Sequence, residues 1–307
     1  MQSTSRRAFL RGRRLPATGW EAFCQRAGQV VSGRFHVLPE RAGAHSARLI
    51  PGAAGDLHHV RALCVQYGVC LLLDGVEHQE LSEGAPVLWV DPGMEVGACE
   101  RLETDSPKWF VQPGCLLGQL AEQQLPGFGA MPFHMTVAAW LADRSLCGWP
   151  TGQTLRSGVT HMSVLLADGN SVVLGPFGAQ EQQPLTPALR RLVSGLFQLS
   201  AGAEAQACRG HEQWPSRYRL DALTPHDAQG INLAHLMLGH GGNLGWVEWV
   251  VLDERLLGTQ ADVSGSGREW CGPRDAALRA QAHALDAHIK DLFDPSGLYP
   301  GAAASGI

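Results

Sequence analysis

The sequence lacks several patterns that mark common classes of enzyme and binding protein. It has no Cys-x-x-Cys pair, no His-x-x-x-His pair and no carboxylate cluster at ligand spacing, which argues against a metal site. A phosphate-binding P-loop and the Gly-x-Ser-x-Gly elbow of hydrolases are also absent. No apolar run approaches the roughly 20 residues that span a bilayer. Its function must therefore be inferred from less specific features.

Lysine is scarce as well. Lys108 and Lys290 are the only lysines, and the net charge of −5 gives no reason to expect nucleic acid as a partner. Eight cysteines without a pairing pattern, in a chain of 307 residues, predict reduced thiols in a reducing compartment. Apolar residues make up 45% of the chain, which is enough for one large domain or two small ones.

Arginines are clustered near the N-terminus. The stretch SRRAFLRG, residues 5–12, resembles a twin-arginine export motif, but a basic and then mixed sequence follows instead of an apolar stretch. We therefore predict a cytoplasmic protein with a basic arm, which either docks on an acidic partner or the inner-membrane surface or is a tail without function. The arginines of this arm are Arg6, Arg7, Arg11, Arg13 and Arg14.

Hydrophobic periodicity predicts short helices and strands in irregular order. Helices are expected over 56–67, 115–127, 186–199 and 276–293. Strands are expected over 68–75, 85–93 and 108–114, as a hairpin around Asp168-Gly169, and after the Gly-rich turn near residue 240. This order is not the regular alternation of a doubly wound sheet, so it predicts an α+β fold.

Five segments in this order resemble the FAD-linked oxidases of the vanillyl-alcohol oxidase type, whose FAD domain is called PCMH-type. The family includes the glycolate and D-lactate oxidases. The segments are DLHHVRALCVQYGVCLLLDG, FVQPGCLLGQLAEQQL, TVAAWLADRSLCGWPTGQTLRSGVTHMSVLLADG, LAHLMLGHGGNLGWVEWVVL and IKDLFDPSGLYPG. The resemblance implies a PCMH-type fold of two α+β subdomains, with FAD as cofactor, over roughly residues 45–300.

The family's cap domain has no counterpart in this sequence. Only a linker, residues 255–275, separates the expected FAD domain, 43–254, from a C-terminal helix and tail, 276–307. The subdomains would cover 43–100 and 101–254, after a basic arm and extension over 1–42. This short form is similar to the accessory flavin subunit of bacterial glycolate oxidase. The resemblance thus implies a larger flavin subunit and an iron–sulfur subunit as partners.

The expected phosphate loop has also changed. Family members carry a glycine-rich loop whose backbone N–H groups bind the FAD pyrophosphate. Here the matching stretch is LDGVEHQ, in which only Gly75 is small, and Glu77 adds a negative charge. The family's second Gly-Gly is Ala138-Ala139. We therefore expect pyrophosphate binding to be weakened or lost.

The resemblance assigns FAD-site residues to four stretches. His78 or Cys147 could tether the flavin covalently, but a surface-turn histidine and a buried thiol are the simpler interpretations. Trp246 would pass near the adenine, or it packs in the core. The complete set is Gly75, Val76, Glu77, His78, Gln79, Pro132, Thr136, Val137, Ala138, Ala139, Cys147, Gly148, Gly152, Gly245 and Trp246.

Two functions remain open from the sequence. In the first, the chain is an FAD-dependent subunit of a 2-hydroxy-acid oxidase or dehydrogenase, which passes electrons to an iron–sulfur partner or a quinone. In the second, it is a non-catalytic paralogue that acts as a scaffold or assembly subunit without flavin. No catalytic base can be assigned, because the cap and its flanking strands usually supply it in the family.

Overall fold

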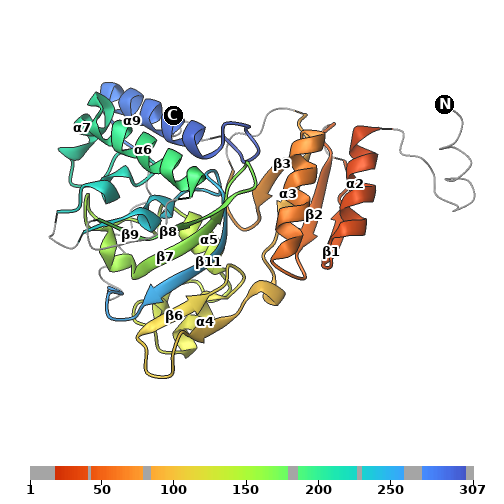
Figure 1. Cartoon of the computed structure of the whole chain (residues 1–307), viewed down its shortest axis with the longest axis horizontal. Coiled ribbons are helices and arrows are strands. Elements are labelled where there is room, and N and C mark those ends of the chain that lie inside the picture. Colours follow the sequence, from red (N-terminus) through yellow and green to blue (C-terminus); the bar gives the residue numbers. More distant parts are fainter. Residues whose placement is uncertain are drawn as a thin grey trace, which may run out of the picture.

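The computed structural model describes residues 18–40, 43–78, 84–178, 186–226, 230–258 and 272–301. The basic arm, Gln79, Cys271 and most of the expected linker lie outside these ranges. The described chain forms two α+β parts, a smaller N-terminal part and a larger part that contains both α6 (Pro187–Ala201) and α9 (Ala276–Phe293) (Figure 1). The expected α+β class is confirmed.

The N-terminal part is a four-stranded sheet with two helices beside it. Its strand order is β1-β2-β4-β3, in which β2, β4 and β3 run parallel and the edge strand β1 is antiparallel. Because α3 connects β2 to the parallel strand β3, it has to cross the face of the sheet. The elements are α2 (Gly19–Val30), β1 (Arg34–Val37), β2 (Ser46–Ile50), α3 (Gly55–Tyr67), β3 (Cys70–Leu73) and β4 (Val87–Val90).

The larger part is built on a five-stranded antiparallel sheet of order β5-β6-β11-β7-β8. Strand β11 comes late in the sequence but lies at the centre of the sheet, between β6 and β7. Its strands are β5 (Cys99–Arg101), β6 (Lys108–Val111), β7 (Val159–Leu165), β8 (Ser171–Leu174) and β11 (Trp246–Asp253). The predicted hairpin is confirmed as β7 and β8, which turn at Gly169 with φ +90°.

Helices and short segments complete the larger part. The helices α6 and α9 pack side by side. They contribute Leu192, Leu196, Leu285 and Ile289 to the core of the larger part. The predicted helix over 276–293 is confirmed as α9. The elements are η1 (Met94–Val96), α4 (Leu117–Glu122), η2 (Phe128–Ala130), α5 (Val137–Ala142), η3 (Thr154–Ser157), β9 (Pro176–Phe177), α6 (Pro187–Ala201), α7 (Ala203–Arg209), η4 (Leu220–Leu223), β10 (Ile231–Asn232), η5 (Leu233–Met237) and α9 (Ala276–Phe293).

Helix α5 joins the two hydrophobic cores. Ala138 and Ala142 pack in the N-terminal core, whereas Val137, Trp140 and Leu141 pack in the larger one. Every residue of this helix is buried, so burial on both sides fixes the orientation of its first turn. This places the expected second phosphate cradle at the junction of the two parts.

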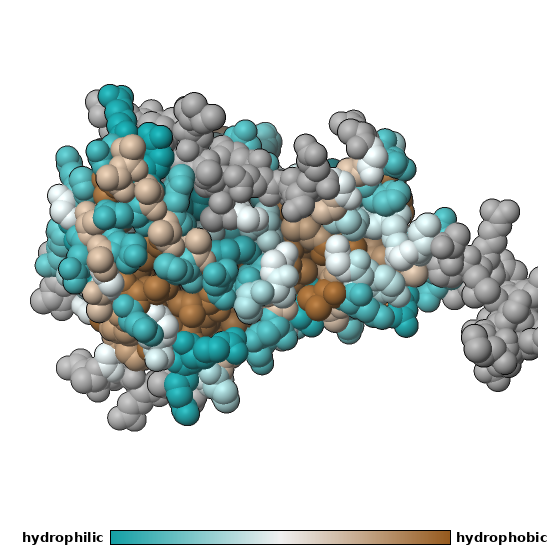
Figure 2. Space-filling view, turned by 90° about the horizontal axis from the view of Figure 1, so that it is seen from above, coloured by the Kyte–Doolittle hydropathy of each residue, from teal (hydrophilic) through white to brown (hydrophobic). Residues whose placement is uncertain are grey.

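The outer surface is mainly hydrophilic on the face that Figure 2 shows, with smaller hydrophobic areas over both parts. Among the described residues, the large hydrophobic side chains that are exposed include Val65 on α3 and Phe197 on α6. None of the helices in the described ranges is long and apolar enough to cross a membrane.

Candidate functional site

The structure divides the predicted site residues between two places. The loop after β3, the start of α5 and the start of β11 meet at the junction of the two parts. There, a cavity is lined by Leu73, Ala138, Gly242, Gly245 and Trp246, among others. The stretch from Cys147 to Gly152 belongs to a separate buried network, described below. Pro132 lies exposed in the turn before α5, and Gln79 is outside the described residues.

The first loop places an acid beside the one glycine of the expected phosphate cradle. Asp74 Oδ1 accepts a hydrogen bond from Gly75 N at 2.9 Å. Its other oxygen, Oδ2, forms an ion pair with Arg48 Nη2 at 2.6 Å, and the same arginine nitrogen lies 2.9 Å from Asp91 Oδ2. The N–H of Gly75 and the nearby guanidinium therefore both bind carboxylates of the protein itself.

His78 packs against the Gly-rich turn that precedes β11. Its Nε2 lies 2.8 Å from Leu73 O. A carbonyl oxygen can only accept a hydrogen bond, so Nε2 is the donor. Its ring contacts Trp89 at 5.6 Å between centroids, and Cε1 lies 3.4 Å from the position that a Cβ on Gly242 would take. Burial lowers the pKa of His78 below its usual value, so the ring is neutral at pH 7. His78 thus fills space between the two parts.

The second cradle, at the start of α5, has its N–H groups satisfied internally. Val137 N donates to Cys115 O at 2.8 Å, and Ala138 N donates to Pro113 O at 3.0 Å. Ala139 N donates to the Oγ1 of the N-cap residue Thr136 at 3.2 Å. These are the donors that the first turn of a helix leaves without intrahelical partners. Binding a phosphate here would require breaking these bonds first.

The Gly-rich turn also serves internal packing. Gly241 and Gly242 have φ of +68° and +74°, a conformation that favours glycine. Gly241 N donates to Ala142 O at 2.9 Å, and Gly239 N donates to Leu141 O at 2.7 Å. The turn therefore satisfies carbonyl groups at the C-terminal end of α5.

His240, within the same turn, is buried and donates through Nδ1 to Met237 O at 2.6 Å. Burial lowers the pKa of His240 to about 4, so the ring is neutral at pH 7. A neutral imidazole supplies no positive charge to attract a phosphate. This histidine has the contacts of a structural residue.

The cavity left at the junction measures about 10 Å³. That volume is on the scale of one water molecule, whereas small-molecule sites usually span about 300–1,000 Å³. Trp246 is only 6% exposed and packs in the N-terminal core. Together with the occupied N–H donors, this shows that the residues at the junction do not fit FAD in the arrangement that the structure describes.

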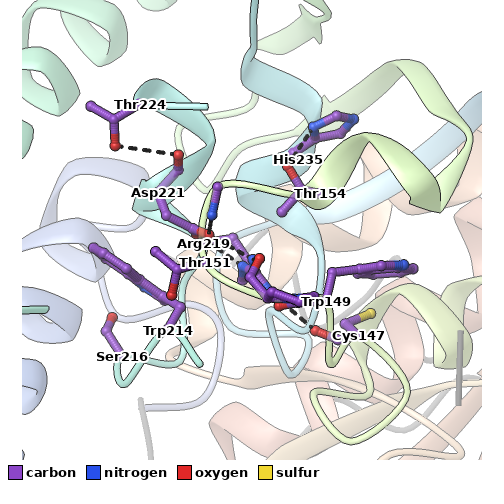
Figure 3. A network of polar contacts seen from close by, with 12 residues as sticks. Cys147, Trp149, Thr151, Thr154, Trp214, Ser216, Arg219, Asp221, Thr224 and His235 are labelled. Atoms are coloured by element: carbon purple, nitrogen blue, oxygen red, sulfur yellow. Dashed lines mark hydrogen bonds and ion pairs between the residues drawn. The ribbon is translucent and has the colours of Figure 1, made fainter. Parts of the chain in front are cut away.

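The second group of predicted residues lies in a buried polar network around Arg219 and Asp221 (Figure 3). Both side chains are fully buried, and Arg219 Nη2 pairs with Asp221 Oδ2 at 2.6 Å. Arg219 donates to Trp149 O at 2.8 Å and Pro150 O at 3.0 Å, while Asp221 accepts from Gly152 N at 2.8 Å. This network fixes the loop that carries three of the predicted site residues, Cys147, Gly148 and Gly152. No local sequence pattern indicates this network.

Cys147 lies inside this loop and is completely buried. Its Sγ is 3.7 Å from Trp140 O, and burial raises the pKa of the thiol to about 12. A thiol is therefore present at neutral pH, not the nucleophilic thiolate. The environment is that of a structural cysteine. Its tethering role remains a prediction without support from these contacts.

No protein-family model and no curated protein matches the chain. Among solved structures, it is similar to 4-ethylphenol oxidase from Gulosibacter chungangensis, at 14% identity and TM-score 0.47, over 78% of this chain and 43% of that one. It is also similar to a variant of a BBE-like protein from Physcomitrella patens, at 11% identity and TM-score 0.43, over 75% and 44%.

An alkyldihydroxyacetonephosphate synthase matches at 14% identity and TM-score 0.39, over 68% of this chain and 32% of the synthase. These structures are PCMH-type FAD-binding proteins, the family that the sequence resembles. The chain spans less than half the length of each of these matched structures. Because the TM-scores are below 0.5, what this chain binds has to be judged from its own residues.

Proposed function

We propose that this chain is a non-catalytic subunit with the fold of FAD-linked oxidases, which acts as a scaffold or assembly subunit and binds no flavin. The observation that carries this proposal is that the N–H of Gly75, in the first expected phosphate cradle, and three N–H groups in the second already have acceptors within the protein. Gly75, Val137, Ala138 and Ala139 all donate to acceptors within the protein. A protein that binds a dinucleotide there would keep such groups available for the ligand.

The charge at the first cradle supports the same proposal. Asp74 Oδ1 lies 2.9 Å from Gly75 N, where a phosphate oxygen would be expected to bind. A carboxylate about 5 Å from a phosphate, at an effective dielectric constant near 20, costs roughly 3 kcal/mol. Releasing Asp74 from Gly75 would also disturb its ion pair with Arg48. Both effects oppose binding of a pyrophosphate.

The partners that suit this proposal are those of the resembled accessory subunit: a larger flavin subunit and an iron–sulfur subunit. In such a complex, the larger chain would carry the flavin and oxidise a 2-hydroxy acid. This chain would contribute surface and no redox group. The rival proposal, an FAD-binding accessory subunit, predicts one flavin in each of the two related chains.

The absorbance spectrum of the purified full-length protein separates these proposals. We expect no bands near roughly 370 and 450 nm, where an oxidised flavin absorbs. Addition of FAD to about 0.1 mM should give no saturable fluorescence change, so that any Kd is weaker than about 0.1 mM. A yellow protein with one flavin per chain, or saturable binding below that concentration, would contradict the proposal.

A further inference from the structure

A cavity of about 340 Å³ lies at the amino-terminal end of β3, where α3, the start of β4 and the C-terminal segment 296–301 meet. The last turn of α3 supplies Cys64 and Val65 to its lining, and β3 supplies Cys70. Small-molecule sites usually span about 300–1,000 Å³. This cavity is therefore large enough for a bound molecule, unlike the one at the junction of the two parts.

The cavity lies at the opposite end of β3 from the expected FAD phosphate loop. Strands β3 and β4 run parallel with Cys70 opposite Val87, and both of these residues line the cavity. Asp74 and Gly75 follow the other end of β3. The strand has 4 residues, which at about 3.3 Å each put roughly 13 Å between the two places. A ligand in this cavity would therefore not occupy the expected pyrophosphate site.

Hydrogen bonds fix the C-terminal segment against β3. Leu71 N, on the edge of the sheet, donates to Leu298 O at 2.9 Å. Asp294 accepts from Leu298 N at 3.0 Å and from Tyr299 N at 2.7 Å. Leu298 and Tyr299 are both buried in the N-terminal core. Because buried backbone contacts hold this wall in place, the cavity is a feature of the fold and not a gap between surface loops.

The walls of the cavity offer no charge to a ligand. Among the described residues that line it, none has a charged side chain. Lys290 and Asp294, close to Cys70, bind each other, with Nζ 2.5 Å from Oδ2. Lys290 Nζ also donates to Asn243 O at 2.7 Å and to Tyr299 O at 3.2 Å. A charged ligand would therefore lose its hydration without gaining an opposite charge.

The polar groups of the lining favour a ligand with a hydrogen-bond donor. Ser296 lines the cavity, and its hydroxyl donates to Asp294 Oδ1 at 2.9 Å. Since the hydroxyl has only one hydrogen, its oxygen can only accept from a ligand. Val65, Ala85 and Val87 add apolar surface. The lining thus suits a mainly apolar molecule that donates a hydrogen bond.

We propose that this cavity binds an uncharged, mainly apolar small molecule that donates a hydrogen bond to Ser296. The molecule contacts α3 and β3 on one side and the C-terminal segment on the other. Because a ligand stabilises the state that binds it, its binding strengthens the attachment of that segment to the sheet. This inference goes beyond the proposed scaffold function and holds whether or not the chain binds flavin.

Two probes with the same ring system test the chemistry of the ligand on the full-length protein. N-phenyl-1-naphthylamine is uncharged, carries one N–H group, and fluoresces more strongly in apolar surroundings. We expect it to bind saturably, with one probe per chain. 1-Anilinonaphthalene-8-sulfonate adds a negative charge and should bind at least about tenfold more weakly, because the lining supplies no cation. Equal affinity for the two probes, or no saturable binding of the uncharged one, would overturn the proposal.

Variants locate the bound probe. Ala85 lines the cavity and is partly exposed, so the indole ring of Ala85→Trp should fill the space and raise the Kd of the uncharged probe at least about tenfold. The matched control Ala53→Trp, in the exposed turn before α3, should bind like wild type. Ser296→Ala removes the acceptor and should weaken binding roughly threefold. Unchanged binding by Ala85→Trp would exclude this cavity, and unchanged binding by Ser296→Ala would exclude the hydrogen bond.

Protection of a thiol gives a second measurement, on the wild-type protein, that decides the matter even if a variant fails to fold. Cys70 lines the cavity, whereas Cys24 lies on α2 and does not. Both are partly exposed, and burial raises the pKa of each thiol to about 11, so Cys24 is a matched reference.

With the uncharged probe at about five times its Kd, roughly one site in six stays free. Alkylation of Cys70 by iodoacetamide should therefore slow about sixfold, while alkylation of Cys24 should keep its rate. The two rates are followed by mass spectrometry of a digest. A rate at Cys70 that the probe does not change, or equal slowing at both thiols, would contradict binding in this cavity.

Discussion

Replacing Asp221 with alanine is expected to lower the free energy of unfolding by about 3–5 kcal/mol, because the positive charge of Arg219 would remain buried without its partner. Both side chains are fully buried, and two pairs of atoms connect them, at 2.9 and 2.6 Å. The substitution also removes the acceptor of Gly152 N. Unfolding by urea, followed by circular dichroism, measures the loss.

Two further variants show whether the buried charge causes this loss. In the double variant Arg219→Met with Asp221→Leu, no charge stays buried, so part of the stability should return. Recovery should be incomplete, because Arg219 also donates to Trp149 O and Pro150 O. The control Arg191→Ala breaks an exposed pair with Asp168 and should cost less than about 1 kcal/mol. Equal losses at Asp221 and Arg191 would contradict the argument.

Only one part of the candidate site at the junction can be predicted from the sequence. The altered loop around Gly75 is visible there, since side chains replace the glycines that the family uses. The hydrogen bonds that occupy the N–H donors of α5 cannot be predicted in this way. The N–H groups of Val137 and Ala138 donate to the carbonyl groups of Cys115 and Pro113, which lie more than 20 positions earlier. Such contacts follow from the tertiary fold and leave no local pattern.

The same distinction holds for the fold. Helix α9 and the β7–β8 hairpin were predicted, because a long amphipathic period and an Asp-Gly turn are strong local signals. Helix α4 is shorter than predicted, since it ends at Glu122 and Gln124 takes a φ of +61°.

Helix α2 was not predicted, although Thr18 accepts from Glu21 N at 3.1 Å in a Thr-x-x-Glu pattern that marks helix starts. Strands β1 and β2 were missed too. Each is short, and the alternation of polar and apolar residues in β1 covers only four positions, of which Val37 is exposed.

Replacing Asp56 with asparagine is expected to cost about 3 kcal/mol of stability in the N-terminal part, because Asp56 is buried and the change removes an acceptor from several partly buried donors. Oδ1 accepts from Ser32 N at 2.8 Å, and Oδ2 accepts from Gly33 N and Gly52 N, each at 2.9 Å. An amide has one oxygen and one NH₂ group, so in either orientation a donor faces donors. Thermal unfolding at pH 7 measures the loss, and the exposed Asp105→Asn serves as control and should change stability by less than about 0.5 kcal/mol.

The pH dependence of this loss tests its cause. Burial on its own would raise the pKa of Asp56, but the hydrogen bonds from Ser32, Gly52 and Gly33 hold it below its usual value. A lowered pKa in the folded state contributes stability above the unfolded value of about 3.9, which is lost as the pH falls through the folded value. The difference between wild type and Asp56→Asn should therefore be largest at neutral pH and shrink below about pH 4. A difference that stays constant down to about pH 2 would mean that the loss comes from packing and not from the carboxylate.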